Sequence, residues 1–211
     1  MPIISLTTDF GEKDHFAGAV KGAIYTELPE IKIVDISHSV SPFNIPEAAY
    51  IIQNAYSSFP KGTIHIIGID SEMNIENKHI AMKLDDHYFI CANNGIMSMI
   101  CAEIAPEKIV EINIHDRIET SFPALDVFVK VACHIARGGT LEVIGKVIDS
   151  IKPIKNLMPY VNDEENQIVG SVIYIDNYGN VISNIKKAFF EKIQKGRAFE
   201  ISARNYTFKK I

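Results

Sequence analysis

The sequence lacks several features on which common classes of protein depend. It has no tryptophan and only three cysteines, Cys91, Cys101 and Cys133, which form no C-x-x-C pair. An odd number of scattered cysteines argues against the disulfide framework of a small secreted domain. The seven histidines are equally dispersed, with no two at the i, i+3 or i+4 spacing of a helical metal site. We therefore expect free thiols, a cytoplasmic protein and no bound metal.

Long apolar runs and concentrated positive charge are also missing. No apolar run approaches the roughly 18 residues that a membrane-spanning helix needs. The 21 lysines and arginines are scattered and are outnumbered by 26 aspartates and glutamates, giving a net charge of −5. Nucleic-acid binders normally carry a basic stripe, so we expect neither a membrane nor a nucleic acid as partner. The glycine fingerprints of P-loop and Rossmann proteins are absent too.

The first 150 residues alternate between apolar strands and amphipathic helices. Apolar, β-branched runs at 3–7, 31–36 and 63–69 predict strands, and apolar residues at 3–4 spacing predict helices at 16–27 and 45–56. This alternation is typical of an α/β domain with a mostly parallel sheet flanked by helices. Further elements are expected downstream, namely a hairpin of 80–84 and 88–91, helices at 95–105 and 125–137, and a strand at 108–112.

The composition changes near residue 150. Residues 151–167 contain two prolines and several charges, which indicates a linker between an N-terminal domain of residues 1–150 and a second, C-terminal domain. Residues 168–211 predict that this second domain is small and β-rich. Because so few residues cannot close a stable β-barrel alone, we expect the second domain to be truncated or to depend on the first. Its strand candidates are 168–175, 181–183, 199–202 and 206–211.

Acidic residues fall at the ends of the predicted strands. Asp9 follows the first strand, Asp35 lies in the second and Asp70 follows the third. Ligands of open α/β sheets bind beyond the carboxyl ends of the strands, and a carboxylate there accepts hydrogen bonds from a ribose diol or an ammonium group. A structural alternative is a turn role for Asp9 and Asp70 and a helix N-cap role for Asp14. The residues alone indicate an enzyme or a ligand-binding protein.

Five segments form an ordered set: LTTDFG at 6–11, VDISH at 34–38, FPKGTIH at 59–65, NG at 94–95 and IDNYGNVISNI at 175–185. Together they resemble the S-adenosylmethionine hydroxide adenosyltransferase family, to which fluorinase and chlorinase are related. Each segment alone is compatible with an ordinary turn or strand, and it is their order that is specific. The resemblance covers nearly the whole chain.

The resemblance implies a fold, a reaction and an assembly. The substrate would be S-adenosylmethionine, hydrolysed to adenosine and L-methionine by hydroxide attack on the ribose 5′ carbon without a metal or other cofactor. The implied assembly is a homotrimer with sites between subunits. By carry-over, Asp9 would bind the ribose hydroxyls with Phe43 packed near them. The residues implied around the methionine end are Asp14, Asp176, Tyr178 and Asn180.

The chain departs from the family pattern around the attacking water. The hydrolases of the family place an Asp, an Arg and a His there. This chain keeps Asp70, but Asn77 stands at the Arg position and Pro123 at the His position. Asp70 and Asn77 are therefore the candidate catalytic residues, with Lys78 or His79 as alternative cations. Three interpretations stay open. The first is a working hydrolase, and the second is a degenerate member that binds S-adenosylmethionine, adenosine or a related nucleoside without efficient turnover. The third is an altered enzyme that uses another nucleophile or another nucleoside.

Overall fold

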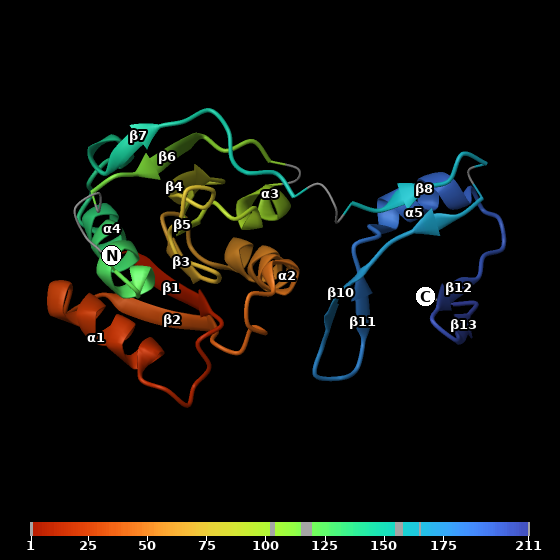
Figure 1. The fold of residues 1–211 in the computed structure, drawn as a ribbon, viewed down its shortest axis with the longest axis horizontal. Coiled ribbons are helices and arrows are strands. Elements are labelled where there is room, and N and C mark those ends of the chain that lie inside the picture. Colours follow the sequence, from red (N-terminus) through yellow and green to blue (C-terminus); the bar gives the residue numbers. More distant parts are fainter. Residues whose placement is uncertain (1, 102–103, 115–119, 155–157, 165, 211) are drawn as a thin grey trace. The chain divides into compact units, whose positions relative to one another are not determined.

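The computed structural model describes residues 2–101, 104–114, 120–154, 158–164 and 166–210. The chain divides into two compact units, residues 1–154 and residues 155–211 (Figure 1). The first unit is a mixed α/β domain, so the predicted fold class is confirmed. None of the helices in the described ranges is long and apolar enough to cross a membrane.

The first unit is built on a seven-stranded sheet with the order β2-β1-β3-β5-β4-β6-β7. The strands β2, β1, β3 and β5 are parallel to one another, and the β4, β6 and β7 pairings are antiparallel. The predicted hairpin is therefore present as β4 and β5. The bounds are β1 (Ile3–Thr8), β2 (Lys32–Ser37), β3 (Ile64–Gly68), β4 (His79–Leu84), β5 (His87–Ala92), β6 (Lys108–Ile112) and β7 (Gly145–Val147).

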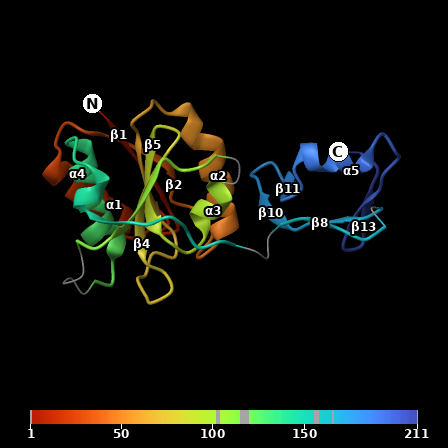
Figure 2. The ribbon, with the colours of Figure 1, turned by 90° about the horizontal axis from the view of Figure 1, so that it is seen from above.

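Helices cover both faces of this sheet (Figure 2). The helices α1 (Phe16–Glu27) and α4 (Val129–Ala136) pack on one face, and α2 (Ile45–Ala55) and α3 (Ile96–Ile100) pack on the other. The strand β3 shows the alternation behind this, because Ile64 and Ile66 join the first core cluster while Ile67 joins the second. Both faces of the sheet are therefore apolar. Burial of each of these isoleucines contributes about 1.5–3 kcal/mol to the stability of the fold.

The helices follow the sequence pattern with two differences. The helix predicted at 95–105 ends early, as α3, and residues 102–103 lie outside the described residues. The helix predicted at 125–137 begins with a π-helical turn, η2 (Ala124–Phe128), before α4. The start of α2 has a capping residue, since Asn44 accepts a hydrogen bond from the Glu47 amide. Two short 3₁₀ turns complete this unit, η1 (Tyr56–Ser58) and η3 (Leu141–Val143).

The second unit consists of three small antiparallel pairs and one helix. Its strands are short, and none of the described residues of its helix α5 (Lys187–Gln194) is buried. The sequence pattern did not predict α5, and β8 falls within the stretch indicated as a linker. The strands are β8 (Tyr160–Val161), β9 (Ile168–Val169), β10 (Val172–Ile175), β11 (Val181–Ser183), β12 (Ile201–Ala203) and β13 (Tyr206–Phe208).

Candidate active site

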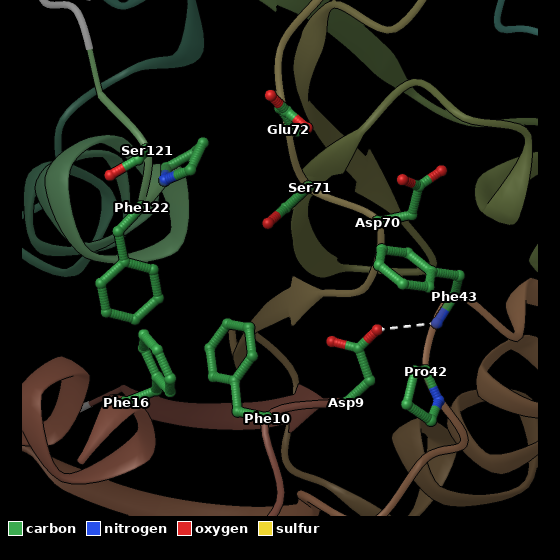
Figure 3. A pocket seen from close by; sticks show the side chains of 11 residues that line it. Asp9, Phe10, Phe16, Pro42, Phe43, Asp70, Ser71, Glu72, Ser121 and Phe122 are labelled. Atoms are coloured by element: carbon green, nitrogen blue, oxygen red, sulfur yellow. Dashed lines mark hydrogen bonds between the residues drawn. The ribbon is translucent and has the colours of Figure 1, made fainter. Parts of the chain in front are cut away.

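A pocket of about 450 Å³ lies at the carboxyl ends of β1 and β3 in the first unit (Figure 3). Carboxylates and phenylalanine rings dominate its lining, and none of the lining residues in the described part of the chain is Lys, Arg or His. The lining residues are Asp9, Phe10, Phe16, Pro42, Phe43, Asp70, Ser71, Glu72, Ser121, Phe122 and Pro123.

The sheet register explains why Asp9 and Asp70 share this pocket. The strands β1 and β3 are parallel neighbours, and Thr8 pairs with Gly68 at their carboxyl ends. The chain therefore leaves both strands at the same edge, with Asp9 one residue and Asp70 two residues farther on. A Cβ at Gly68 would come within 2.9 Å of the Phe10 ring, so a larger residue here would displace that ring.

Asp9 is held at the edge of the pocket by backbone groups. Its carboxylate oxygen Oδ2 accepts a hydrogen bond of 2.9 Å from the Phe43 amide (Figure 3). Burial raises the pKa of Asp9, and the negative charge of Asp70 acts in the same direction. Hydrogen bonds from the backbone amides of Phe43 and Asp70 oppose that rise in pKa. The carboxylate thus links the three loops that follow β1, β2 and β3.

Phe43 adopts a backbone conformation that bulky residues rarely take. Its φ is +61°, in the left-handed region, where a non-glycine residue costs about 1–2 kcal/mol. Its side chain is 72% exposed, so packing of the ring does not repay that cost. Strain of this kind is concentrated at ligand sites. The hydrogen bond from its amide to Asp9 helps to hold the ring at the mouth of the pocket.

Asp70 also has a positive φ, +43°. The turn that it begins is fixed by Asn94, whose amide nitrogen Nδ2 donates to the carbonyl oxygens of Ile69 and Asp70 at 3.0 and 3.3 Å. Asn94 is buried, and its own oxygen accepts from the Ile96 amide at the start of α3. The Asn94-Gly95 segment noted in the sequence therefore fixes the backbone of the catalytic candidate Asp70.

Three phenylalanines form the wall of the pocket opposite Asp9 and Phe43 (Figure 3). The ring centroids of Phe10, Phe16 and Phe122 lie 5.2–5.9 Å from one another. Such a wall offers apolar area to a flat ligand ring and orients it through edge and face contacts. The adjoining Pro123 directly precedes η2 and has no side-chain donor to offer a water molecule.

Two predicted residues of the first unit lie outside the pocket lining. Asp14 is exposed, and the expectation that it caps α1 is wrong, because His15 occupies the N-cap position without a side-chain hydrogen bond. Asn77 closes a turn in which its amide donates to Asn74 Oδ1 at 2.9 Å. The side-chain oxygen of Asn77 accepts from Lys152 Nζ, also at 2.9 Å.

Asp35, the third of the acidic residues expected near strand ends, also lies outside the pocket lining. It lies within β2, 2.5 Å from Lys21 Nζ and 3.1 Å from His38 Nε2. Burial pushes the pKa of Asp35 upward, but the hydrogen bond from Lys21 and the contact with His38 outweigh burial and bring the pKa below its usual range. Asp35 is therefore paired with Lys21 and His38 and does not line the pocket.

The predicted residues of the second unit form one turn between β10 and β11. Asp176 Oδ1 accepts from the amides of Tyr178 and Asn180 at 2.9 and 2.8 Å, and Oδ2 accepts from Asn180 Nδ2 at 2.7 Å. The Asn180 side chain and these amides lower the pKa of Asp176, so its carboxylate is held ionised. Tyr178 is 92% exposed. The segment is a tight turn that presents a fixed carboxylate and an exposed aromatic ring.

The structure thus brings together Asp9, Phe43 and Asp70 of the predicted set. Sequence reasoning missed the aromatic wall and Glu72 as lining residues. Phe10 directly follows Asp9, and this adjacency was an available signal. The position of Phe122 depends on how residues 120–123 pack beside α1, which no local pattern reveals.

Comparison with known proteins places the chain among related sequences. The model of the SAM hydroxide adenosyltransferase N-terminal domain matches residues 4–145, and the model of the corresponding C-terminal domain matches residues 170–211. An (R)-S-adenosyl-L-methionine hydrolase of Methanocaldococcus jannaschii is 32% identical over 194 residues, 89% of this chain and 68% of the relative. A fluorinase of Nocardia brasiliensis is 24% identical, over 92% of this chain and 75% of its own.

Solved structures show the same fold. An uncharacterized conserved protein from Thermotoga maritima superposes with a TM-score of 0.83 and 29% identity, covering 98% of this chain and 81% of its own. A conserved hypothetical protein from Thermus thermophilus gives a TM-score of 0.69 at 21% identity, over 87% of this chain and 72% of its own. At that identity the second match supports the fold alone.

Proposed function

Because this chain belongs to the SAM hydroxide adenosyltransferase family, we propose that it binds S-adenosylmethionine and hydrolyses it to adenosine and L-methionine. Hydroxide attacks the ribose 5′ carbon; the new C5′–O bond forms as the C5′–S bond breaks, and methionine leaves as a neutral thioether. The similarity to named S-adenosylmethionine hydrolases supports this reaction. The observation that carries it is the meeting of Asp9, Phe43 and Asp70 in one pocket.

In this proposal Asp9 binds the ribose. A carboxylate accepts hydrogen bonds from two neighbouring hydroxyls at once, and the partial burial that raises the pKa of Asp9 also strengthens such bonds. Phe43 lies beside Asp9 at the pocket mouth and packs against the sugar. The wall of Phe10, Phe16 and Phe122 supplies apolar area for the remainder of the nucleoside.

Asp70 is proposed to hold the attacking water and to take its proton. It lies on the lining of the same pocket as Asp9, on a turn braced by Asn94. In-line attack depends on holding water and substrate at a fixed distance and angle. A braced turn with positive φ provides that fixed position more reliably than a mobile loop.

The finer parts of the proposal concern the methionine end and the assembly. We assign Asp14, Asp176, Tyr178 and Asn180 to the methionine ammonium and carboxylate, in a cytoplasmic homotrimer that needs no metal. Support comes from the fixed hydrogen bonding of the Asp176 turn and from the family of the chain. A sedimentation experiment tests the trimer, and an unchanged rate after addition of a chelator tests independence from metal.

A second candidate function is nucleoside binding without efficient turnover. It is favoured by two observations: Asn77 lies outside the pocket lining with its side chain bound to Lys152, and Pro123 offers no donor to the water. Loss of a charge-stabilising or acid–base group commonly costs about 10²–10⁴ in rate.

One experiment separates the two functions. Purified protein is incubated with S-adenosylmethionine while binding heat is followed by calorimetry and products by chromatography. Adenosine and methionine in equal amounts, formed over many turnovers per site, support hydrolysis. Binding heat without products supports the second candidate, and absence of both rejects the nucleoside site altogether.

A further inference from the structure

His38 lies buried behind the pocket, between the two loops that build one side of it. Its exposed fraction is 6%, and it directly follows β2. The loop after β1 carries the lining residues Asp9 and Phe10, and the loop that begins at His38 carries Pro42 and Phe43. His38 itself is not a lining residue, so any effect on the site acts through these two loops.

Two hydrogen bonds attach His38 to the loop that follows β1. Its ring nitrogen Nδ1 lies 2.7 Å from the hydroxyl of Thr8, the residue immediately before Asp9. Its carbonyl oxygen accepts from the Gly11 amide at 2.8 Å, two residues after Asp9. Asp9 and Phe10 are therefore flanked on both sides by bonds to the same histidine. The bond from the Phe43 amide to Asp9 ties the two loops a third time.

The opposite side of the His38 ring faces Asp35. His38 Nε2 lies 3.1 Å from Asp35 Oδ1, without the alignment of a regular hydrogen bond. In the bond between Nδ1 and the Thr8 hydroxyl, the roles of donor and acceptor depend on the tautomer of the ring. Asp35 is fixed in turn by Lys21. Thr8, His38, Asp35 and Lys21 thus form a continuous chain of polar contacts.

We propose that His38 is a positioning residue of the nucleoside site, which holds Asp9 and Phe10 at a fixed spacing from Phe43 through Thr8 and Gly11. The inference rests on the proposed function, since it assigns to His38 a part in that same site. A ligand that contacts both loops binds more weakly when the spacing between the loops fluctuates. Part of the binding free energy is then used to order the loops. His38 does not line the pocket, so its loss affects binding more than the chemical step.

The test compares substitutions that break the contact between Thr8 and His38 with a matched substitution at the neighbouring Thr7. Thr8→Val removes the hydroxyl and keeps the branched shape, and His38→Leu removes both ring nitrogens. Thr7→Val makes the same chemical change one residue away, at an equally buried position of β1. His38→Asn places an amide near the position of Nδ1 and serves as the conservative rescue. All proteins are assayed for dissociation constant and turnover with S-adenosylmethionine, and for hydrogen exchange of the Gly11 and Phe43 amides without ligand.

We expect Thr8→Val and His38→Leu to raise the dissociation constant and the KM about tenfold, with kcat changed less than about threefold. The same variants should lose exchange protection at Gly11 and Phe43, while Thr7→Val and His38→Asn stay near wild type. Folded Thr8→Val and His38→Leu proteins with wild-type affinity and protection would overturn the inference. If the wild type binds no nucleoside, the proposed function fails, and the exchange data still show whether His38 holds the loops.

Discussion

The carboxylate of Asp9 accepts a 2.9 Å hydrogen bond from the backbone amide of Phe43, whose φ of +61° places it in the left-handed region. The bond joins residues 34 positions apart and links the ends of the neighbouring parallel strands β1 and β2. A strained, exposed aromatic residue is thus fixed by the carboxylate that we assign to the ribose. This pairing explains why the two residues act as one element of the site.

The first prediction concerns the charge and the acceptor of Asp9. Asp9→Ala removes both, and we expect nucleoside binding to be lost while the fold remains intact. Asp9→Asn keeps an acceptor for the Phe43 amide and removes only the charge. Since hydrogen bonds to a charged group are worth about 1.5–3 kcal/mol, its affinity should fall about 10- to 100-fold. Calorimetric titration with adenosine measures both variants, and unchanged affinity in Asp9→Ala would reject the ribose role.

The second prediction separates strain from ligand contact at Phe43. Phe43→Gly relieves the strain of the left-handed conformation but raises the conformational entropy of the unfolded chain. Because the two effects oppose each other, the free energy of unfolding should lie within about 1 kcal/mol of wild type. Phe43→Ala keeps the strain and should be less stable than Phe43→Gly. Both variants lose the ring and should bind nucleoside more weakly. Urea unfolding and titration check this. If both variants proved several kcal/mol less stable than wild type, the ring would support the fold and the account of Phe43 would be wrong.

The third prediction tests Asp70 as the group that activates water. Asparagine tolerates a positive φ better than other residues, so Asp70→Asn should preserve the turn braced by Asn94. We expect kcat to fall about 10²- to 10⁴-fold, with the affinity for S-adenosylmethionine changed only a few-fold. Glu72→Gln is the matched control, because it neutralises another carboxylate of the pocket lining. Equal losses of turnover in both variants would remove Asp70 from its assigned role.

The fourth prediction concerns acid stability and the buried His65. Burial lowers the pKa of His65 to about 3, and its ring is bonded to Ser5 Oγ at 2.6 Å and to His87 Nδ1 at 3.2 Å. The unfolded chain takes up a proton here below about pH 6.5, whereas the folded protein does so only near pH 3. The contribution of His65 to the free energy of unfolding is therefore fully present above pH 6.5. Below that pH it falls by about 1.4 kcal/mol per pH unit.

For His65 alone this amounts to roughly 2 kcal/mol between pH 7 and pH 5. Burial also lowers the pKa of His87, which adds to the same trend. His65→Gln should be less stable than wild type at pH 7 but lose less stability on acidification, as urea unfolding at the two pH values would measure. His134→Gln, at a partly exposed histidine, should keep the wild-type slope. A wild-type slope in His65→Gln would contradict the prediction.

The sequence predicted the elements that have a strong apolar period. The helix expected at 16–27 is α1 with the same bounds, because Val20 and Ile24 are buried on a single face. The helix α5 was missed although Phe189 and Ile193 are spaced as on one helical face, because only eight residues carry that pattern. The π-helical turn before α4 contains Phe128, which is buried in the core, and the apolar pattern did not predict this turn.

The site was predictable in part for a similar reason. Asp9 and Asp70 were identified because parallel strands place their carboxyl ends together, and the register of β1 and β3 does so. Asp35 obeyed the same sequence logic and Asp14 was assigned by the family resemblance, yet neither lines the pocket. Asp35 is instead paired with Lys21 of α1 and with His38, three residues farther along the chain. The pairing with Lys21 depends on tertiary packing and has no local sequence signal.

Hydrolysis at the ribose 5′ carbon is tested most directly by turnover of S-adenosylmethionine in water enriched in ¹⁸O. We predict adenosine carrying one heavy oxygen at its 5′ hydroxyl, an equal amount of unlabelled L-methionine, and loss of both products in Asp70→Asn. Adenosine without the label, or bound S-adenosylmethionine recovered unchanged after prolonged incubation, would contradict the proposed hydrolysis.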